Sequence, residues 1–252
     1  MNGNLSQSPY NYGLVAPFNT AFVETLFPVL EEMIVFRVSD LVNFDRLPTA
    51  DQLTGLSLAP SDDMFVVFIS HTWYDKDHAD SPTGDLWRAL RNYLFRARPQ
   101  DYIWMDVLCI PPDIDMHRKK RFIYSIPHYM SRTRDCWAFA FDLQRYLSSA
   151  WCFLETMAAP IWVLGYPRII LVRSGPLLKL HRVPGKQLSH VRVSDPEDLP
   201  HVLRIMTHKL LGYGVHPPQV ESWVRTCYQQ NNLDFVGDFA KWKEDFQDIF
   251  PE

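Results

Sequence analysis

A continuous apolar run at residues 64–69, ending in Ser70, constrains the fold of this chain more than any other feature. The run has no polar side chain for a solvent-exposed face, which is typical of a strand in a parallel sheet that helices cover on both faces. Further strand-like runs lie at residues 102–106, 136–141 and 168–172, with a weaker one at 190–193. The sequence therefore predicts five strands.

The segments between these runs have helical spacing. Leu86, Leu90 and Leu94 recur every four residues, and residues 117–130 predict a second helix in which Pro127 is a late break. Strands that alternate with helices indicate a parallel sheet with right-handed crossovers. We expect an α/β protein with a flavodoxin-like, three-layer fold and five parallel strands in the order 2-1-3-4-5.

The change of pattern near residue 62 predicts three parts. Residues 1–61 form an N-terminal extension, residues 62–211 an α/β domain, and residues 212–252 a helical extension packed on that domain. Apolar spacing predicts extension helices at 19–35, 219–229 and 235–250, and a helix at 200–211 that closes the domain. The last extension helix carries a stripe of aromatic residues.

The charge of the chain limits its expected binding partners, and its cysteines indicate its compartment. A net charge of −4 and a pI near 6.1 give no support to binding of nucleic acid or of an anionic membrane. No apolar run reaches the roughly 20 residues that span a bilayer, and the polar start does not resemble a signal peptide. The four cysteines are scattered without a C-x-x-C pair, so we expect reduced thiols and a cytoplasmic protein.

The expected strand order brings two segments to one crevice. Ligands bind where the order of parallel strands reverses, at the carboxyl ends of strands 1 and 3. Strand 1 ends at Ser70, His71 and Trp73, and strand 3 ends just before a helix that Ser148 or Ser149 can cap. A carboxylate on that helix can stabilise the positive charge that develops on a sugar ring when a glycosidic bond breaks.

The helix after strand 3 supplies such a carboxylate, Glu155, with Trp151 on the same face. Each candidate also has a plain structural interpretation. Glu155 can be a solvated helix residue, and Trp151 an ordinary buried aromatic rather than a surface for a base or ribose. Asp106, at the end of strand 2, can contact a ligand or cap the next loop. Cys152 is expected to be core packing rather than a nucleophile.

Several familiar sites are missing from the sequence. It contains no G-x-G-x-x-G, no P-loop and no G-x-S-x-G motif. The acidic run from Asp75 to Asp80 lacks the oxygen ligand and the glycine that an EF-hand requires, and His71 has no spaced partner for zinc. We therefore expect no metal and no bound cofactor.

These segments resemble a known family. Val67-Phe68-Ile69-Ser70-His71 is similar to the first strand of Toll/interleukin-1 receptor (TIR) domains, and Met105-Asp106 with its proline-bearing loop resembles the second strand and BB loop. The most specific match is Ser149-Ala150-Trp151-Cys152-Phe153-Leu154-Glu155, which resembles the S-x-W-C-x-x-E helix of plant and bacterial TIR domains. The segment from Trp104 to Ile110 also resembles heterokaryon-incompatibility domains.

The resemblance implies a flavodoxin-like fold and cleavage of NAD+ at the nicotinamide–ribose bond. Glu155 matches the catalytic glutamate, and the product would be ADP-ribose or a cyclic isomer, in immune or cell-death signalling. It also implies that the loop from Val107 to Met116 mediates self-association. Five residues are then expected to shape the NAD+ site: Ser70, His71, Trp73, Asp106 and Trp151.

Two other functions stay open. A TIR-like module can act by assembly alone, with Glu155 incidental. A related enzyme, such as a deoxyribosyltransferase, can act on a nucleoside or nucleotide other than NAD+.

Overall fold

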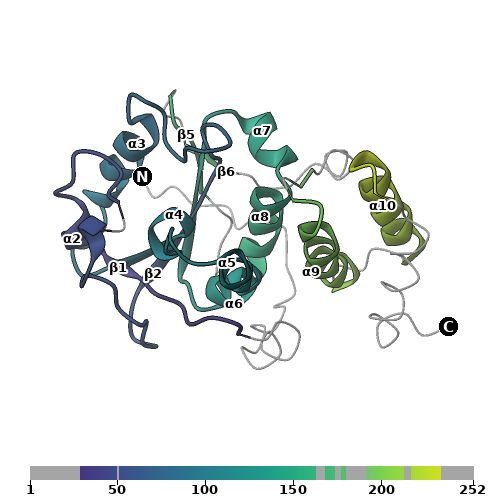
Figure 1. Ribbon diagram of the computed structural model, residues 1–252, viewed down its shortest axis with the longest axis horizontal. Helices are drawn as coiled ribbons and strands as arrows, with labels where there is room; N and C mark the ends of the chain where they lie inside the picture. Colours follow the sequence, from purple (N-terminus) through teal and green to yellow (C-terminus); the bar gives the residue numbers. More distant parts are fainter. Residues whose placement is uncertain are drawn as a thin grey trace, which may run out of the picture.

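The computed structural model describes residues 29–49, 51–162, 168–173, 177–179, 192–193, 195–212 and 217–233. Within these residues the chain is an α/β protein built on one sheet of six strands, in the order β1-β3-β2-β4-β5-β6. Figure 1 shows helices around this sheet, with α8, α9 and α10 following one another toward the right of the view. The strands are β1 (Phe36–Arg37), β2 (Val66–His71), β3 (Tyr102–Met105), β4 (Asp135–Ala140), β5 (Arg168–Leu171) and β6 (Leu177–Lys179).

The four central strands have the expected arrangement. β3, β2, β4 and β5 lie side by side and parallel, and they correspond to predicted strands 2, 1, 3 and 4 in that order. The prediction of five parallel strands is wrong at the edges, because β1 pairs with β3 and β6 pairs with β5 in antiparallel fashion. Only residues 172–176 separate β5 from β6, and a parallel crossover needs a dozen or more residues.

The predicted fifth strand, residues 190–193, lies mostly outside the described residues. Of its described part, Arg192 forms an isolated parallel bridge with Ser149. The position next to β5 is thus taken by β6.

Helices and short helical turns connect the strands. They are α2 (Val38–Leu41), η1 (Asp51–Leu53), α3 (Asp85–Leu94), α4 (Asp106–Cys109), α5 (Met116–Tyr124), α6 (Ile126–Ser131), α7 (Leu143–Ser148), α8 (Ala150–Trp162), α9 (Asp198–Gly212) and α10 (Pro217–Gln230). The helix predicted over residues 117–130 is divided at Ser125, because Pro127 stands in the first turn of α6, where a missing N–H is tolerated.

The helix that carries Glu155 begins close to its predicted start. Ser149 has extended backbone angles, and its carbonyl accepts the Phe153 N–H that opens α8. A separate short helix, α7, precedes it and begins at Leu143. The Asp142 carboxylate accepts the Arg145 N–H and caps that helix.

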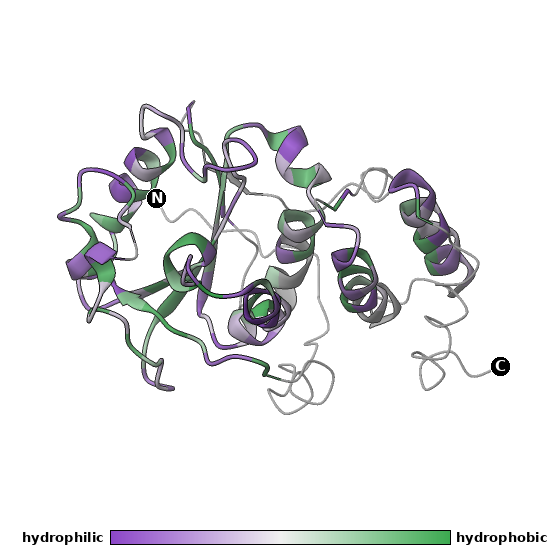
Figure 2. Ribbon diagram, in the orientation of Figure 1, coloured by the Kyte–Doolittle hydropathy of each residue, from purple (hydrophilic) through white to green (hydrophobic). Residues whose placement is uncertain are grey.

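Helices cover both faces of the sheet. On one face Phe68 of β2 stacks on Trp104 of β3 at 4.7 Å between ring centroids, and Trp104 contacts Tyr129 of α6. Side chains alternate along a strand, so Trp137 of β4, one residue after the register partner of Phe68, points to the other face. There it contacts Tyr93 of α3. Both α3 and α10 contain hydrophilic and hydrophobic residues, as expected of helices with one buried side (Figure 2).

The described part of the N-terminal segment belongs to this core. β1 extends the sheet, and Met33, Val35 and Leu41 are buried in the same hydrophobic cluster as the central strands. Residues 29–35 are not helical, so the helix predicted over 19–35 is wrong in its described part, and the rest of it lies outside the described residues.

At the other end of the chain, α8, α9 and α10 pack together around a second cluster that includes Phe153, Leu203 and Val224. The aromatic stripe at residues 235–250 lies outside the described residues. None of the described helices combines the length and the apolar character needed to cross a membrane.

Candidate functional site

Ser70 and Glu155 meet at the carboxyl end of β2. Ser70 lies two residues after Phe68 and therefore on the face of the sheet that α6 and α8 cover. Its hydroxyl donates a hydrogen bond to Oε2 of Glu155, in the second turn of α8. Glu155 is only 8% exposed. The structure thus brings the end of the first predicted strand and the helix glutamate into direct contact.

The surroundings of Glu155 oppose its ionisation. Burial raises the pKa of the carboxyl to about 8, and the nearby Asp106 carboxylate acts in the same direction. The Ser70 hydrogen bond and the charge of His71 partly offset this rise. At neutral pH the Glu155 carboxyl is therefore mainly protonated, and a nearby positive charge would favour its ionised form.

His71 and Asp106 form an ion pair beside this carboxyl. His71 Nε2 lies 2.7 Å from Asp106 Oδ1; the imidazole is buried, and the Asp106 side chain is 31% exposed. Burial disfavours the charged imidazole, yet the Asp106 carboxylate outweighs it and raises the pKa of His71. Burial also opposes ionisation of Asp106, but pairing with His71 and hydrogen bonds from the Val107 N–H and the Trp73 side chain lower the pKa of this carboxyl.

Trp73 stands at the exposed end of this group. Its side chain is the least covered of the predicted site residues at 36% exposed, and its ring centroid lies 6.3 Å from that of His71. Its hydrogen bond to Asp106 places an exposed indole beside a partly exposed carboxylate. Trp73 and Asp106 therefore form a rim next to the buried Ser70 and Glu155.

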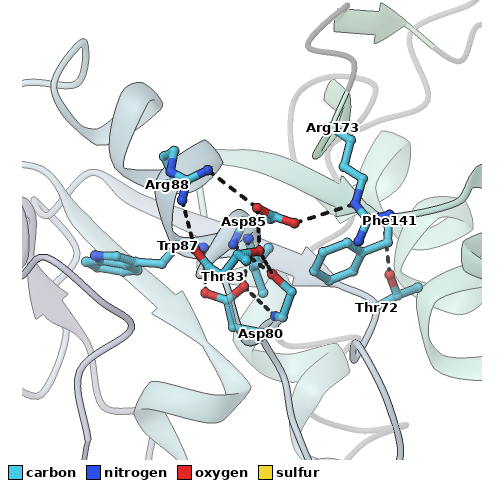
Figure 3. Close-up of polar contacts among 10 residues, drawn as sticks. Thr72, Asp80, Thr83, Asp85, Trp87, Arg88, Phe141 and Arg173 are labelled. Atoms are coloured by element: carbon cyan, nitrogen blue, oxygen red, sulfur yellow. Dashed lines mark hydrogen bonds and ion pairs between the residues drawn. The ribbon is translucent and has the colours of Figure 1, made fainter.

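The loop after β2 is fixed by hydrogen bonds to its surroundings (Figure 3). The Thr72 hydroxyl accepts the Phe141 N–H at 3.4 Å and ties the ends of β2 and β4 together. Asp80 accepts the N–H groups of Leu86 and Trp87, at 2.8 and 3.0 Å, and so caps the start of α3.

Across the described residues, no three His, Cys, Asp or Glu side chains are grouped as metal ligands.

Trp151 and Glu155 lie on the same helix but form hydrogen bonds to different elements of the fold. Its indole N–H donates to Asp198 of α9 at 3.0 Å, and its ring lies 6.0 Å from that of His201. The side chain is half-buried and packs against both hydrophobic clusters. Of the two interpretations of Trp151, the packing role is visible in the structure.

Cys152 is buried, and its thiol donates to the His71 carbonyl at 3.3 Å. Burial, with the negative charge of Glu155 in support, raises the pKa of this thiol. A thiol that stays protonated is a poor nucleophile, in agreement with the expected packing role.

Tyr146 belongs to this site, although the sequence does not indicate it. Its hydroxyl lies 2.5 Å from the Ser70 hydroxyl, and the Thr156 hydroxyl donates to it at 3.3 Å. Tyr146 is on α7 and fully buried. Spacing could not reveal it, because Tyr146 and Glu155 belong to two helices separated by the break at Ser149.

No family model, curated protein or solved structure matches the chain significantly. The membership in the TIR family that the motifs suggest therefore stays a prediction.

Proposed function

We propose that this protein is a TIR-like NAD+ nucleosidase or cyclase with Glu155 as its catalytic carboxylate. One observation carries the proposal: a buried glutamate, anchored to the end of the first parallel strand, lies beside the His71–Asp106 ion pair. Perturbed titratable groups clustered at the carboxyl ends of parallel strands are typical of functional sites.

The fold supports this proposal. The order of the four central strands agrees with a flavodoxin-like arrangement, in which β2 and β4 flank the reversal of strand order. Both Ser70 at the end of β2 and the helix that follows β4 then contribute to one site. The antiparallel edge strands lie away from this reversal.

The reaction suits a carboxyl group of this kind. When the bond from ribose C1′ to the nicotinamide nitrogen breaks, its electron pair passes to the ring, which leaves as neutral nicotinamide without a general acid. The ribose then carries positive charge, which an ionised Glu155 stabilises strongly because it is screened from water. Water attacks C1′ and loses a proton to give ADP-ribose, or a nitrogen of the adenine attacks to give a cyclic isomer.

The rim suits the cationic end of NAD+. The face of an indole attracts a cationic ring, and a carboxylate adds to that attraction. We assign this role to Trp73 and Asp106, with His71 holding Asp106 in its ionised form. Ser70 holds Glu155, and Trp151 forms the wall between the site and α9.

Self-association is proposed for the loop from Val107 to Met116. The first part of this loop is helical in α4, and Met116 at its end is 64% exposed. An exposed methionine beside a proline-bearing loop suits contact with a second copy of the chain. This feature also favours the second candidate function, a module that acts by assembly without catalysis.

The test is turnover of NAD+ by the purified protein, followed by chromatography of nicotinamide and the ribosyl products. Glu155→Gln removes the charge with little change of shape, and Glu221→Gln, at a partly exposed glutamate of α10 that pairs with Arg225, is the matched control. We expect E155Q to lose activity by at least 100-fold and E221Q to retain it.

Three other outcomes would contradict this proposal. Full activity in E155Q would remove Glu155 from the mechanism. Cleavage of nucleosides but not of NAD+ would favour a deoxyribosyltransferase-like enzyme. No turnover at any protein concentration, with assembly that Met116→Asp abolishes, would favour the non-enzymatic module.

A further inference from the structure

Four buried side chains form a chain of hydrogen bonds that ends at Glu155. The Thr156 hydroxyl contacts Tyr146 at 3.3 Å, Tyr146 contacts Ser70 at 2.5 Å, and Ser70 contacts Glu155 Oε2. Tyr146 is fully buried, and Ser70 and Thr156 are nearly so. The three hydroxyls come from β2, α7 and α8, so only the folded protein can align them.

The proton of each hydroxyl has a defined direction when Glu155 is ionised. A carboxylate only accepts, so Ser70 donates to Glu155. The Ser70 proton is then used, and the Ser70–Tyr146 contact requires Tyr146 as the donor. The single Thr156 proton is shared between the Cys152 carbonyl at 2.8 Å and the Tyr146 hydroxyl at 3.3 Å. The Ser70 and Tyr146 protons thus both point toward the carboxylate, and bonds aligned in this way strengthen one another.

We propose that Tyr146 is a positioning residue: its hydroxyl donates to Ser70 and thereby directs the Ser70 proton onto Glu155, which stabilises the carboxylate form. This inference rests on the proposed function of Glu155. Without the Tyr146 hydroxyl, the Ser70 proton is free to turn away from Glu155, and the carboxylate loses part of its stabilisation.

Other titratable groups act on Glu155 from every element around it. They are His71 on β2, Asp106 on α4, Cys136 on β4, Tyr146 on α7 and Cys152 on α8. Burial raises the pKa of both thiols and of the phenol, so these three stay neutral across the working range of pH. His71 and Asp106 have opposite charges and partly cancel. The hydroxyl chain is therefore a separate, uncharged influence on the Glu155 carboxyl.

The experiment measures ionisation of Glu155 in the full-length protein without any substrate. Glutamate labelled with ¹³C at the side-chain carboxyl is followed by NMR from pH 5 to pH 10, and E155Q identifies the signal of Glu155. The variants are Tyr146→Phe, which keeps the buried ring, and Ser70→Ala. Tyr129→Phe is the matched control, because Tyr129 is also fully buried but donates to the Glu31 carbonyl.

We expect Y146F to raise the pKa of Glu155 by about half a pH unit and S70A by about one to two units. Y129F should leave it unchanged. If Y146F does not fold, Thr156→Val interrupts the same chain one step further away and should raise the pKa by a smaller amount. A Glu155 pKa in Y146F, or in T156V in its place, that equals or falls below that of Y129F would overturn the inference.

Turnover separates this inference from the proposed function. If the protein cleaves NAD+, the pH profile of kcat/KM in Y146F should shift upward with the same plateau at high pH. NAD+ cleavage without a pKa shift would refute the role of Tyr146 alone. A pKa shift without NAD+ cleavage would refute the proposed reaction while leaving the hydrogen-bond chain established.

Discussion

Trp151 and Glu155 lie one turn apart on α8, yet their side chains hold two different parts of the fold. The indole of Trp151 donates to Asp198 on α9, and the carboxyl of Glu155 binds Ser70 on β2. Because α9 in turn packs on α10, α8 links the candidate site to the C-terminal helices. A substitution at Trp151 can therefore be compared with a substitution at Glu155.

Asp198→Ala should lower the free energy of unfolding by about 1–3 kcal/mol, because it leaves the indole N–H of Trp151 without its acceptor. In Trp151→Phe the same substitution should have a smaller effect, with a coupling of at least about 0.5 kcal/mol. Urea unfolding of the single and double variants measures this coupling, with the exposed Asp113→Ala as the control. Strictly additive effects would show that the hydrogen bond contributes nothing.

The pH dependence of NAD+ cleavage should follow Glu155. The carboxyl has a pKa of about 8 and must be ionised to act, so kcat/KM should rise with pH and level off above that value. A bound cationic substrate favours the carboxylate, so kcat should rise at lower pH than kcat/KM. Steady-state kinetics from pH 5.5 to 9.5 test both statements. A kcat/KM that falls across this range would contradict the role of a carboxylate.

Glu155 should also make the protein less stable as pH rises. Its pKa is about 8 in the folded chain against 4.5 for an ordinary glutamate, so the folded state holds a proton that the unfolded state has released. The contribution of Glu155 to the free energy of unfolding is fully present below pH 4.5. It is lost as pH rises toward 8, by up to about 1.4 kcal/mol per pH unit. E155Q should remove this slope from urea unfolding curves, whereas Glu221→Gln should keep it. An unchanged slope in E155Q would show that Glu155 ionises normally.

Asp106→Asn should destabilise the protein most in mildly acidic solution. The raised pKa of His71 makes its charged form stabilising below pH 6.5, and this contribution disappears as pH rises through the folded value. The lowered pKa of Asp106 preserves the pair down to about pH 4. The loss in D106N should therefore be larger at pH 5.5 than at pH 9. Asp75→Asn disrupts the exposed Asp75–His78 pair and should have a much smaller effect at both pH values.

Val224→Asp should show that α10 is part of the folded core. Val224 is fully buried in the cluster that α8, α9 and α10 share, so the new carboxylate would have no water and no charged partner there. We expect a loss of about 3–5 kcal/mol in the free energy of unfolding. Gln219→Asp, at an exposed position of the same helix, should lose little. Equal effects at both positions would mean that α10 does not pack on the domain.

The pattern of apolar residues was sufficient to predict the central sheet. The runs that became β2, β3, β4 and β5 contain almost no polar side chain, and this pattern survives in any fold that buries both faces of a strand. The edges of the sheet were not predictable in the same way. β1 has two residues and β6 three, and such short strands are set by the neighbours that pair with them.

The candidate site was predictable only in part. The expected strand order brings Ser70 near the helix of Glu155, whereas the His71–Asp106 pair depends on how side chains turn at two strand ends. Tyr146 could not be found from spacing, since it lies on α7 and the break at Ser149 separates it from the helix of Glu155. Trp151 lies on the predicted face of its helix, but its hydrogen bond goes to α9, which lies far along the chain.

The amino-acid sequence by itself determined the α/β class, the four central strands and the position of Glu155 after the third of them. These features follow from local periodicity, which does not depend on distant contacts, whereas the order of the central strands depends on pairing between distant segments. The tertiary structure alone decided that Glu155 is buried, that its pKa rises to about 8, and that three hydroxyls from separate elements form a chain of hydrogen bonds that ends at it. Ionisation depends on the water and charges that surround a group, and only the packed fold determines what surrounds Glu155.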